Sequence, residues 1–301
     1  MDAIDQSMNA EPSETSDQTI DAWIGSKQAD VFEHQRRQVV HCVLHAIYGD
    51  IEFGKRLVLK GGVLMALAHA SSRQTADVDF TGIGDASDFE GRMVSRLGKA
   101  LQRSPMECGY LDLRCQIQGA SIQPPGEDRN FQMLVVRVAS ARTNDRNQME
   151  RLANGNAVHV TKIEIGFNEW IGETNQLIVD DNDTRVIVYS ISDLIAEKYR
   201  ALLQQPVRNR VRRQDVFDIK HVLARLPDNT FDKTAIHKAI VEKCRIRGLR
   251  PQRNSISGPD VMRMAKAEYT TLQLEQPTNN LDFDTDFEVV QQFYESLPWD
   301  S

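Results

Sequence analysis

The chain has 301 residues, of which 41% are hydrophobic and 26% charged, enough to build the core of one large domain or two ordinary ones. No window is long and apolar enough to cross a bilayer, and the first residues lack the basic and apolar regions of a secretory signal. The four cysteines show neither C-x-x-C pairing nor the density of a disulfide scaffold. We therefore expect a cytoplasmic protein with no membrane partner.

The formal net charge of −7 argues against a nucleic-acid partner for the chain as a whole, but the charge is distributed unevenly. Residues 1–30 carry seven acids and one base, and residues 254–301 carry nine acids and two bases. Residues 197–253 carry fifteen bases and six acids. This basic segment between two acidic ends could still bind RNA.

The N-terminal half predicts a mixture of helices and strands. Residues 1–29 are polar and lack periodic apolar positions, so we expect a disordered acidic tail. An amphipathic helix follows, and then a strand at 56–60 that ends at Gly61 and Gly62 before a short buried helix. Beyond it we expect a helix over 89–101 and strands at 77–80, 110–117, 131–138, 157–167 and 185–189.

The C-terminal half predicts helices alone. Ser190 is a good N-cap for the helix ISDLIAEKYRALLQ, and Pro206 is expected to help end it. Further helices are expected over 214–225, 233–245 and 259–274. The chain therefore divides into the tail, an α/β domain and a helical domain with an acidic C-terminal tail, at residues 1–29, 30–190 and 191–301.

The segment LVLKGGVLMALAHASSRQTADVDF, residues 57–80, carries the chemistry. Glycines between a strand and a helix let backbone N–H groups approach a phosphate at the helix N-terminus. Asp77 and Asp79 alternate along the next strand, so both carboxylates project from one face, and such oxygen ligands suit Mg²⁺. A lone GG is more often a turn and a lone D-x-D a solvated strand edge, but their conjunction favours nucleotide chemistry.

This block resembles the shared motif of DNA polymerase β-like nucleotidyltransferases. The fuller string K-G-G…R-x-T-x-D-V-D-F is similar to the AbiEii/AbiGii-type nucleotidyltransferase toxin family of bacterial toxin–antitoxin and phage-defence systems. ISDLIAEKYRALLQ and RRQDVFDIKHVL resemble that family's A-E-K-x-x-A and R-x-x-D-x-[YF]-D helices. The resemblance spans about residues 56–226 and implies an α+β fold, with a polymerase β-like α/β core and mixed sheet followed by a helical region.

The resemblance also implies roles for single residues. Gly61 and Gly62 would hold the triphosphate of an NTP, and Asp77 and Asp79 would bind Mg²⁺ or Mn²⁺. Glu164 would supply the third metal-binding carboxylate and help deprotonate the attacking hydroxyl, although a polar residue there is equally an exposed strand position. The remaining candidates for nucleotide binding flank the glycines and the metal strand: Lys60, Arg73 and Thr75.

Two further candidates lie in the helical half. The resemblance implies that Lys198 contacts the triphosphate and that Asp215 holds Lys198 or the nucleotide in place. From the residues alone, a surface salt bridge between two helices explains them as well. His41 and His45 are spaced for a shared metal, but a packing role is the stronger interpretation because the motif lacks the glutamate of H-E-x-x-H.

The resemblance implies transfer of NMP from an NTP to an acceptor, expected to be an RNA end such as the 3′ end of tRNA, by a toxin with a cognate antitoxin. Alternatives are a catalytically silent nucleotide-binding partner and an enzyme that modifies protein or a small molecule. We expect the basic segment to bind the RNA, although its bases could instead neutralise the acidic tails, contact an antitoxin or be solvated. The predicted RNA contacts are Arg208, Arg210, Arg212, Arg213, Arg245, Arg247, Arg250 and Arg253.

Overall fold

The computed structural model describes residues 19–72, 74–75, 77–124, 130–275 and 281–299. The chain forms two compact units. The first comprises residues up to 70, 75–169 and 175–188, and the second 71–74, 170–174 and 189–301. The main division, between Val188 and Tyr189, falls close to residue 190, where the sequence pattern changes from mixed to helical.

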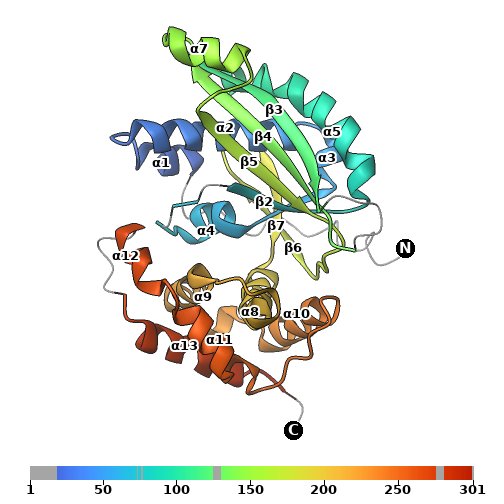
Figure 1. Ribbon diagram of the computed structural model, residues 1–301, viewed down its shortest axis with the longest axis vertical. Coiled ribbons are helices and arrows are strands. Elements are labelled where there is room, and N and C mark those ends of the chain that lie inside the picture. Colours follow the sequence, from blue (N-terminus) through green and yellow to red (C-terminus); the bar gives the residue numbers. More distant parts are fainter. Residues whose placement is uncertain (1–18, 73, 76, 125–129, 276–280, 300–301) are drawn as a thin grey trace. The chain divides into compact units, whose positions relative to one another are not determined.

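A mixed sheet in the order β3-β4-β5-β2-β1-β7-β6 forms the centre of the first unit (Figure 1). Neighbouring strands are antiparallel at β3–β4, β4–β5 and β1–β2, and parallel at β2–β5 and β1–β7. The fold is therefore α+β with a mixed sheet, as expected. The strands are β1 Leu57–Lys60, β2 Asp77–Gly82, β3 Leu113–Gln123, β4 Met133–Arg142, β5 His159–Gly166, β6 Thr174–Ile178 and β7 Arg185–Tyr189.

One face of this sheet packs against the helices α2 (Val31–Tyr48) and α5 (Ala86–Leu101) (Figure 1). The alternate residues of β2 that face this layer, Val78 and Phe80, are fully buried, and Phe80 contacts the ring of Tyr48 at the end of α2. Alternation along the strand then places the other residues of β2, including both aspartates, on the opposite face. The sheet thus has one apolar and one polar face at β2.

The helix α1 (Ile20–Gly25) corrects the expected N-terminal tail. Its residues Ile20, Trp23 and Ile24 are buried, so the prediction of disorder is wrong for this segment. Arg37 of α2 binds α1 through Trp23. Its guanidinium group lies over the Trp23 ring, donates to the carbonyl oxygen of Trp23 and pairs with Glu33. The rest of the expected tail, residues 1–18, lies outside the described residues.

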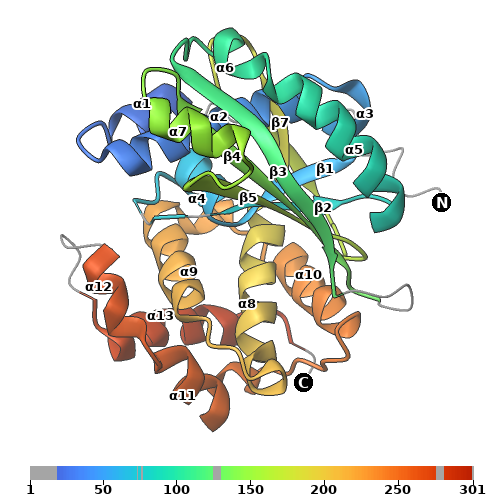
Figure 2. The same ribbon diagram turned by 45° about the horizontal axis from the view of Figure 1, so that its top comes forward.

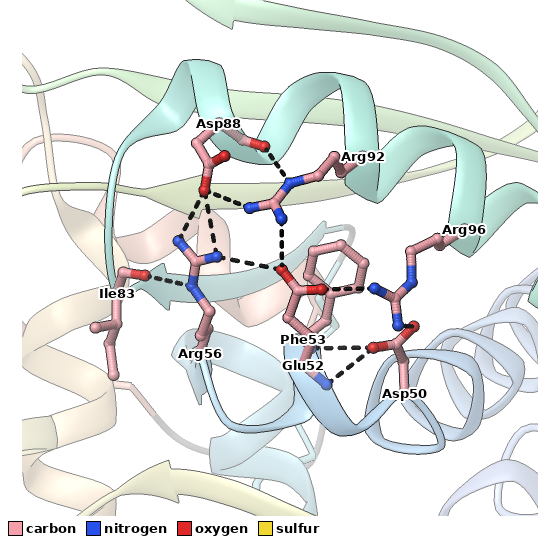
Figure 3. Close-up of polar contacts among 8 residues, drawn as sticks. All are labelled: Asp50, Glu52, Phe53, Arg56, Ile83, Asp88, Arg92 and Arg96. Atoms are coloured by element: carbon pink, nitrogen blue, oxygen red, sulfur yellow. Dashed lines mark hydrogen bonds and ion pairs between the residues drawn. The ribbon is translucent and has the colours of Figure 1, made fainter. Parts of the chain in front are cut away.

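An ion-pair network closes the end of β1 that is remote from Lys60 (Figure 3). Arg56 pairs with Glu52 and Asp88 and donates to the carbonyl oxygen of Ile83, just beyond β2. Glu52 also pairs with Arg92 and Arg96, so α5 is bound to the short helix α3 (Ile51–Gly54). These pairs are partly exposed and fasten helix to sheet in the first unit. The remaining helices of this unit are α4 Gly61–His69, α6 Ser104–Glu107 and α7 Arg146–Ala153.

The second unit is helical, and α8 (Ile191–Arg208) lies between α9 (Arg213–Arg225) and α10 (Lys233–Arg245) (Figure 2). The expectation that Pro206 ends the first helix is wrong, because α8 continues through it. Proline has no N–H for the carbonyl oxygen of Leu202, and the side-chain amide of Gln205 donates to that oxygen instead, at 3.1 Å. Asn209, in the left-handed conformation, ends the helix.

The last part of the chain differs from the sequence expectation in two ways. The single helix expected over 259–274 is interrupted, because Glu268 adopts a left-handed conformation after α11. The acidic C-terminal segment is folded as α13, which buries Phe283, Phe287 and Val290 and is therefore not a tail. The elements concerned are α11 Pro259–Lys266, η3 Tyr269–Thr271, α12 Leu272–Glu275 and α13 Phe283–Glu295, preceded by η1 Asp228–Thr230 and η2 Ser255–Ser257. None of the described helices combines the length and apolar character needed to span a bilayer.

Candidate active site

The glycine turn between β1 and α4 brings a carboxylate against the helix N-terminus. Gly61 opens α4 with φ of +69°, a conformation that glycine adopts without strain. A Cβ atom at this position would lie only 2.1 Å from Oδ2 of Asp79, so the two residues are in direct contact. The residue before the helix, Lys60, makes no side-chain cap. The turn therefore places Asp79 at an end of α4 that favours negative charge.

The three predicted carboxylates share the polar face of the sheet. Asp77 and Asp79 alternate along β2, and Asp79 is in register with Glu164 on the parallel strand β5. In a sheet, side chains in register on neighbouring strands project from the same face. Ile163 and Ile165, on either side of Glu164, are fully buried, whereas Glu164 is half-buried. The structure thus brings all three predicted residues together.

Lys60 joins the same row from the other side. It is in register with Asp79 across the antiparallel pair β1–β2. Its ammonium group pairs with Glu169, and the two side chains are 12% and 13% exposed. Oε2 of Glu169 also accepts a hydrogen bond of 2.6 Å from the hydroxyl group of Thr81. The face therefore carries a further acid, Glu169, that the sequence motifs did not single out.

The loop before β2 is described only in part. Arg73, a predicted phosphate contact, lies outside the described residues. Thr75 donates a hydrogen bond of 3.3 Å from its hydroxyl group to the carbonyl oxygen of Asp77. This bond fixes the chain at the start of the strand that carries the two aspartates. Contact of Thr75 with a nucleotide stays a prediction.

The donor set on this face suits a divalent cation. Mg²⁺ uses oxygen ligands and commonly takes one or two protein carboxylates, with water and substrate phosphates completing the octahedron. Asp77 and Asp79 supply such a pair on one strand, and the contact with Gly61 holds Asp79 in place. Among the described residues, no three or more His, Cys, Asp or Glu side chains are grouped so that they could hold a metal ion. An open site of two carboxylates fits this arrangement.

In the second unit, the predicted pair Lys198 and Asp215 meets, with 3.5 Å between Nζ and Oδ1. The closer partner of Lys198 is Asp218, at 2.5 Å. Asp218 is fully buried and the Lys198 side chain is 8% exposed, so this is a buried pair and not the surface salt bridge that the residues alone allowed. The family-like helix motif contains both aspartates. The resemblance implied Asp215 as the residue that holds Lys198 or the nucleotide, whereas in the structure Asp218 is the closer partner of the lysine.

A cavity of about 190 Å³ lies at the start of α9. Oδ2 of Asp215 is buried without a hydrogen-bond partner, and α9 has no side-chain N-cap. Asp215 therefore has an oxygen left to accept a hydrogen bond, whereas Asp218 is committed to Lys198. The cavity is lined by Arg210, Val211, Arg212, Arg213, Gln214, Asp215 and Glu268.

The arginines predicted to bind RNA lie in two places in the second unit. One group lies at the end of α8, in the connection to α9 and at the first residue of α9: Arg208, Arg210, Arg212 and Arg213. The other lies at the end of α10 and in the connection to α11: Arg245, Arg247, Arg250 and Arg253. Some are engaged within the unit: Arg213 donates to the hydroxyl of Thr271, and Arg245 pairs with Glu242. Other bases of the segment are internal partners too, since Lys220 pairs with Asp286 of α13.

The histidines of α2 form structural hydrogen bonds in the first unit. Nε2 of His41 lies 2.9 Å from Oδ2 of Asp180, and its Nδ1 lies 2.8 Å from the Tyr110 hydroxyl. Burial alone would lower the pKa of His41, but its hydrogen bonds to Asp180 and Cys108 outweigh burial and raise the pKa to about 9. His45 contacts Thr184 and Glu107. The two side chains therefore contact different partners.

A comparison with protein families gives a match over most of the chain. The profile of the family described as nucleotidyl transferase AbiEii toxin, type IV TA system, matches residues 43–292. The chain belongs to the AbiEii family. The match extends beyond both ends of the motifs that suggested it, and it includes the second unit through α13. Membership assigns this AbiEii protein to the nucleotidyltransferase toxins and implies an antitoxin partner.

Two solved structures resemble the chain at low sequence identity. JHP933 from Helicobacter pylori is 14% identical, with a TM-score of 0.52 over 88% of this chain and 93% of that one. A second H. pylori crystal structure is 15% identical, with a TM-score of 0.47 over 89% of this chain and 95% of that one. No protein with a curated description matches the AbiEii chain significantly. The likeness to JHP933 shows a common fold.

Proposed function

We propose that the protein transfers a nucleotidyl group from an NTP to the 3′ end of an RNA, with tRNA as the acceptor, and that Mg²⁺ or Mn²⁺ is required. The observation that carries the proposal is the carboxylate row on one sheet face, where Asp79 lies between Glu164 and the glycine turn. Family membership supports the reaction class. Arrest of growth by this transfer, relieved by an antitoxin, would serve in phage defence.

The residues divide the reaction among them. The backbone amides of Gly61 and Gly62 bind the triphosphate. Asp77 and Asp79 would hold the metal, and Glu164 on the same face is the third carboxylate that the resemblance implies. When bound, the metal stabilises the charge on the attacking and leaving oxygens. The acceptor hydroxyl oxygen bonds to the α-phosphorus, the bond to the β-phosphate bridging oxygen breaks, and pyrophosphate leaves. The carboxylate of Glu164 takes the proton of the attacking hydroxyl.

A labelling experiment tests this function. The protein is incubated with each of the four NTPs labelled at the α-phosphate, Mg²⁺ and total RNA, and label is measured in RNA and in protein. We expect label in RNA. RNA that is treated with periodate before the reaction should take up no label, because periodate oxidises the 2′,3′-diol at the 3′ end and leaves no hydroxyl to attack. Label in protein would assign the enzyme a protein substrate instead. Label in neither would contradict transfer to RNA and would leave a small-molecule acceptor or a catalytically silent partner protein.

We also propose that the two arginine groups bind the acceptor through its phosphates. Binding to phosphates releases counterions, so removal of each arginine–phosphate interaction should flatten the slope of log K against log salt by about 0.7 to 0.9. The variant in which Arg245, Arg247, Arg250 and Arg253 become Gln is expected to bind RNA with a flatter slope. Unchanged affinity and slope would exclude this surface from RNA binding and favour antitoxin binding by the same bases.

A further inference from the structure

Lys60 is placed by its strand and by an ion pair with Glu169. It ends β1, precedes Gly61 in the chain and projects from the carboxylate face because it is in register with Asp79. Its ammonium group pairs with Glu169, and both side chains are nearly buried. Glu169 is in turn fixed by the hydroxyl group of Thr81, which is itself fully buried.

The sheet leaves room for Glu169 at one position. Thr81 is in register with Gly166 on β5, one step along the face from Asp79 and Glu164. A Cβ atom at Gly166 would lie 2.6 Å from Oε1 of Glu169. The absence of a side chain at this position therefore lets the Glu169 carboxylate lie over β5, where it reaches both Thr81 and Lys60.

A lysine side chain that binds a ligand gains from a residue that fixes the position of its ammonium group. Its ammonium is a point charge on a flexible four-carbon stem, and fixing it in one place costs side-chain entropy. A nearly buried acid is also costly unless it is paired and hydrogen-bonded. The contacts of Glu169 meet both requirements in the folded protein, so the entropy cost is met before a ligand arrives.

We propose that Glu169, with Thr81, is a positioning residue that holds the Lys60 ammonium for the triphosphate of the substrate. The proposal rests on the proposed function for the identity of that substrate. Glu169 acts through Lys60 and does not touch the reacting atoms. Its favourable effect on triphosphate binding therefore exists only while Lys60 is present.

Two effects of Glu169 on an anionic ligand oppose each other. Its charge repels a triphosphate, whereas its contacts keep Lys60 in place. Substitution separates them: Glu169→Gln removes the charge but keeps an oxygen that accepts from Thr81 and Lys60, and Glu169→Ala removes both. If positioning dominates, the Ala variant binds a triphosphate more weakly and the Gln variant restores the affinity.

The test is equilibrium binding of inorganic tripolyphosphate with Mg²⁺ to the full chain by calorimetry, with folding checked by circular dichroism. Glu169→Ala is expected to weaken binding about tenfold, the size of one charge-assisted hydrogen bond, and Glu169→Gln to stay within about threefold of wild type. In a Lys60→Ala background, Glu169→Ala should cause no further loss of affinity, because only the repulsion of the triphosphate by Glu169 is then removed. The matched control is Glu52→Ala, which removes an acid from the arginine network at the other end of β1 (Figure 3).

Several results would overturn the positioning role. They are unchanged or tighter binding by Glu169→Ala, an equal loss in both backgrounds, an equal loss in the Glu52→Ala control, or no binding by the wild-type protein. The nucleotide-transfer assay of the wild type decides the proposed function separately. Transfer without the binding pattern removes only the role of Glu169, and the binding pattern without transfer removes only the proposed function.

Discussion

The contact between Gly61 and Asp79 constrains both residues. A side chain at position 61 would meet the Asp79 carboxylate and would also have to adopt a positive φ. Position 61 therefore requires glycine on two independent grounds, one steric and one conformational. Both place Asp79, the proposed metal ligand, next to the start of α4.

We predict that Gly61→Ala lowers the free energy of unfolding by at least about 1–2 kcal/mol, the cost of a left-handed conformation, with the clash adding to it. Urea titration measures the change. The matched control is Gly91→Ala in α5, where a Cβ would meet nothing within 4 Å. It should be neutral or stabilising by up to about 1 kcal/mol. Equal stability of the Gly61 and Gly91 variants would contradict the contact.

His41 of α2 pairs with Asp180, which lies in the turn between β6 and β7. Its pKa, raised to about 9, exceeds the ordinary value of 6.5 because the hydrogen bonds to Asp180 and Cys108 outweigh burial. A raised pKa stabilises the fold fully below the unfolded value, and this stabilisation is lost as pH rises from about 6.5 to 9. Burial raises the pKa of Asp180, but the hydrogen bonds from His41 and Thr184 together outweigh burial and hold this pKa below its usual range.

We predict that His41→Gln is less stable than wild type at pH 6, by on the order of 3 kcal/mol, and that the difference shrinks by pH 9.5. Urea unfolding at both pH values measures it. Asp180→Asn breaks the same pair and should show the same loss of pH dependence. A difference that is constant between pH 6 and 9.5 would show that His41 contributes by packing alone.

At the scale of elements, α8 and α9 are joined by a buried lysine and two aspartates with different tasks. Asp218 is committed to Lys198, whereas Asp215 is farther from the lysine and keeps a buried oxygen with no partner. Removal of one member of a buried pair leaves an uncompensated charge, which is far more costly than loss of a loose contact. The two aspartates should therefore separate in stability measurements.

We predict that Asp218→Asn lowers the free energy of unfolding by about 3–5 kcal/mol, and that Asp215→Asn lowers it by about 1 kcal/mol or less. In the nucleotide-transfer assay, Asp215→Asn is nevertheless expected to lower turnover strongly, as the family resemblance implies. Equal destabilisation by the two substitutions would contradict the division of tasks. An active Asp215→Asn enzyme would remove Asp215 from the functional residues.

At the scale of the whole molecule, the sequence predicted what depends on local patterns. The glycine turn, the alternation of Asp77 and Asp79 and most strands carry their signal within a few residues. The position of Glu169 over Gly166, the choice of Asp218 as partner of Lys198 and the burial of α1 by Arg37 depend on residues far apart in the sequence. No local pattern indicates such contacts, so they could not be predicted from one sequence.

The central claim is that Asp77 and Asp79 hold the metal of a nucleotidyltransferase. The most direct measurement is transfer of labelled nucleotide to RNA by Asp77→Ala and Asp79→Ala, beside Asp183→Ala, an exposed acid paired with Arg185. We expect transfer by both site variants to fall to background while their circular dichroism stays near wild type, because each loses a proposed metal ligand from a strand whose apolar face is intact. The Asp183 variant should stay active. Retention of most of the transfer activity by either site variant would contradict the assignment.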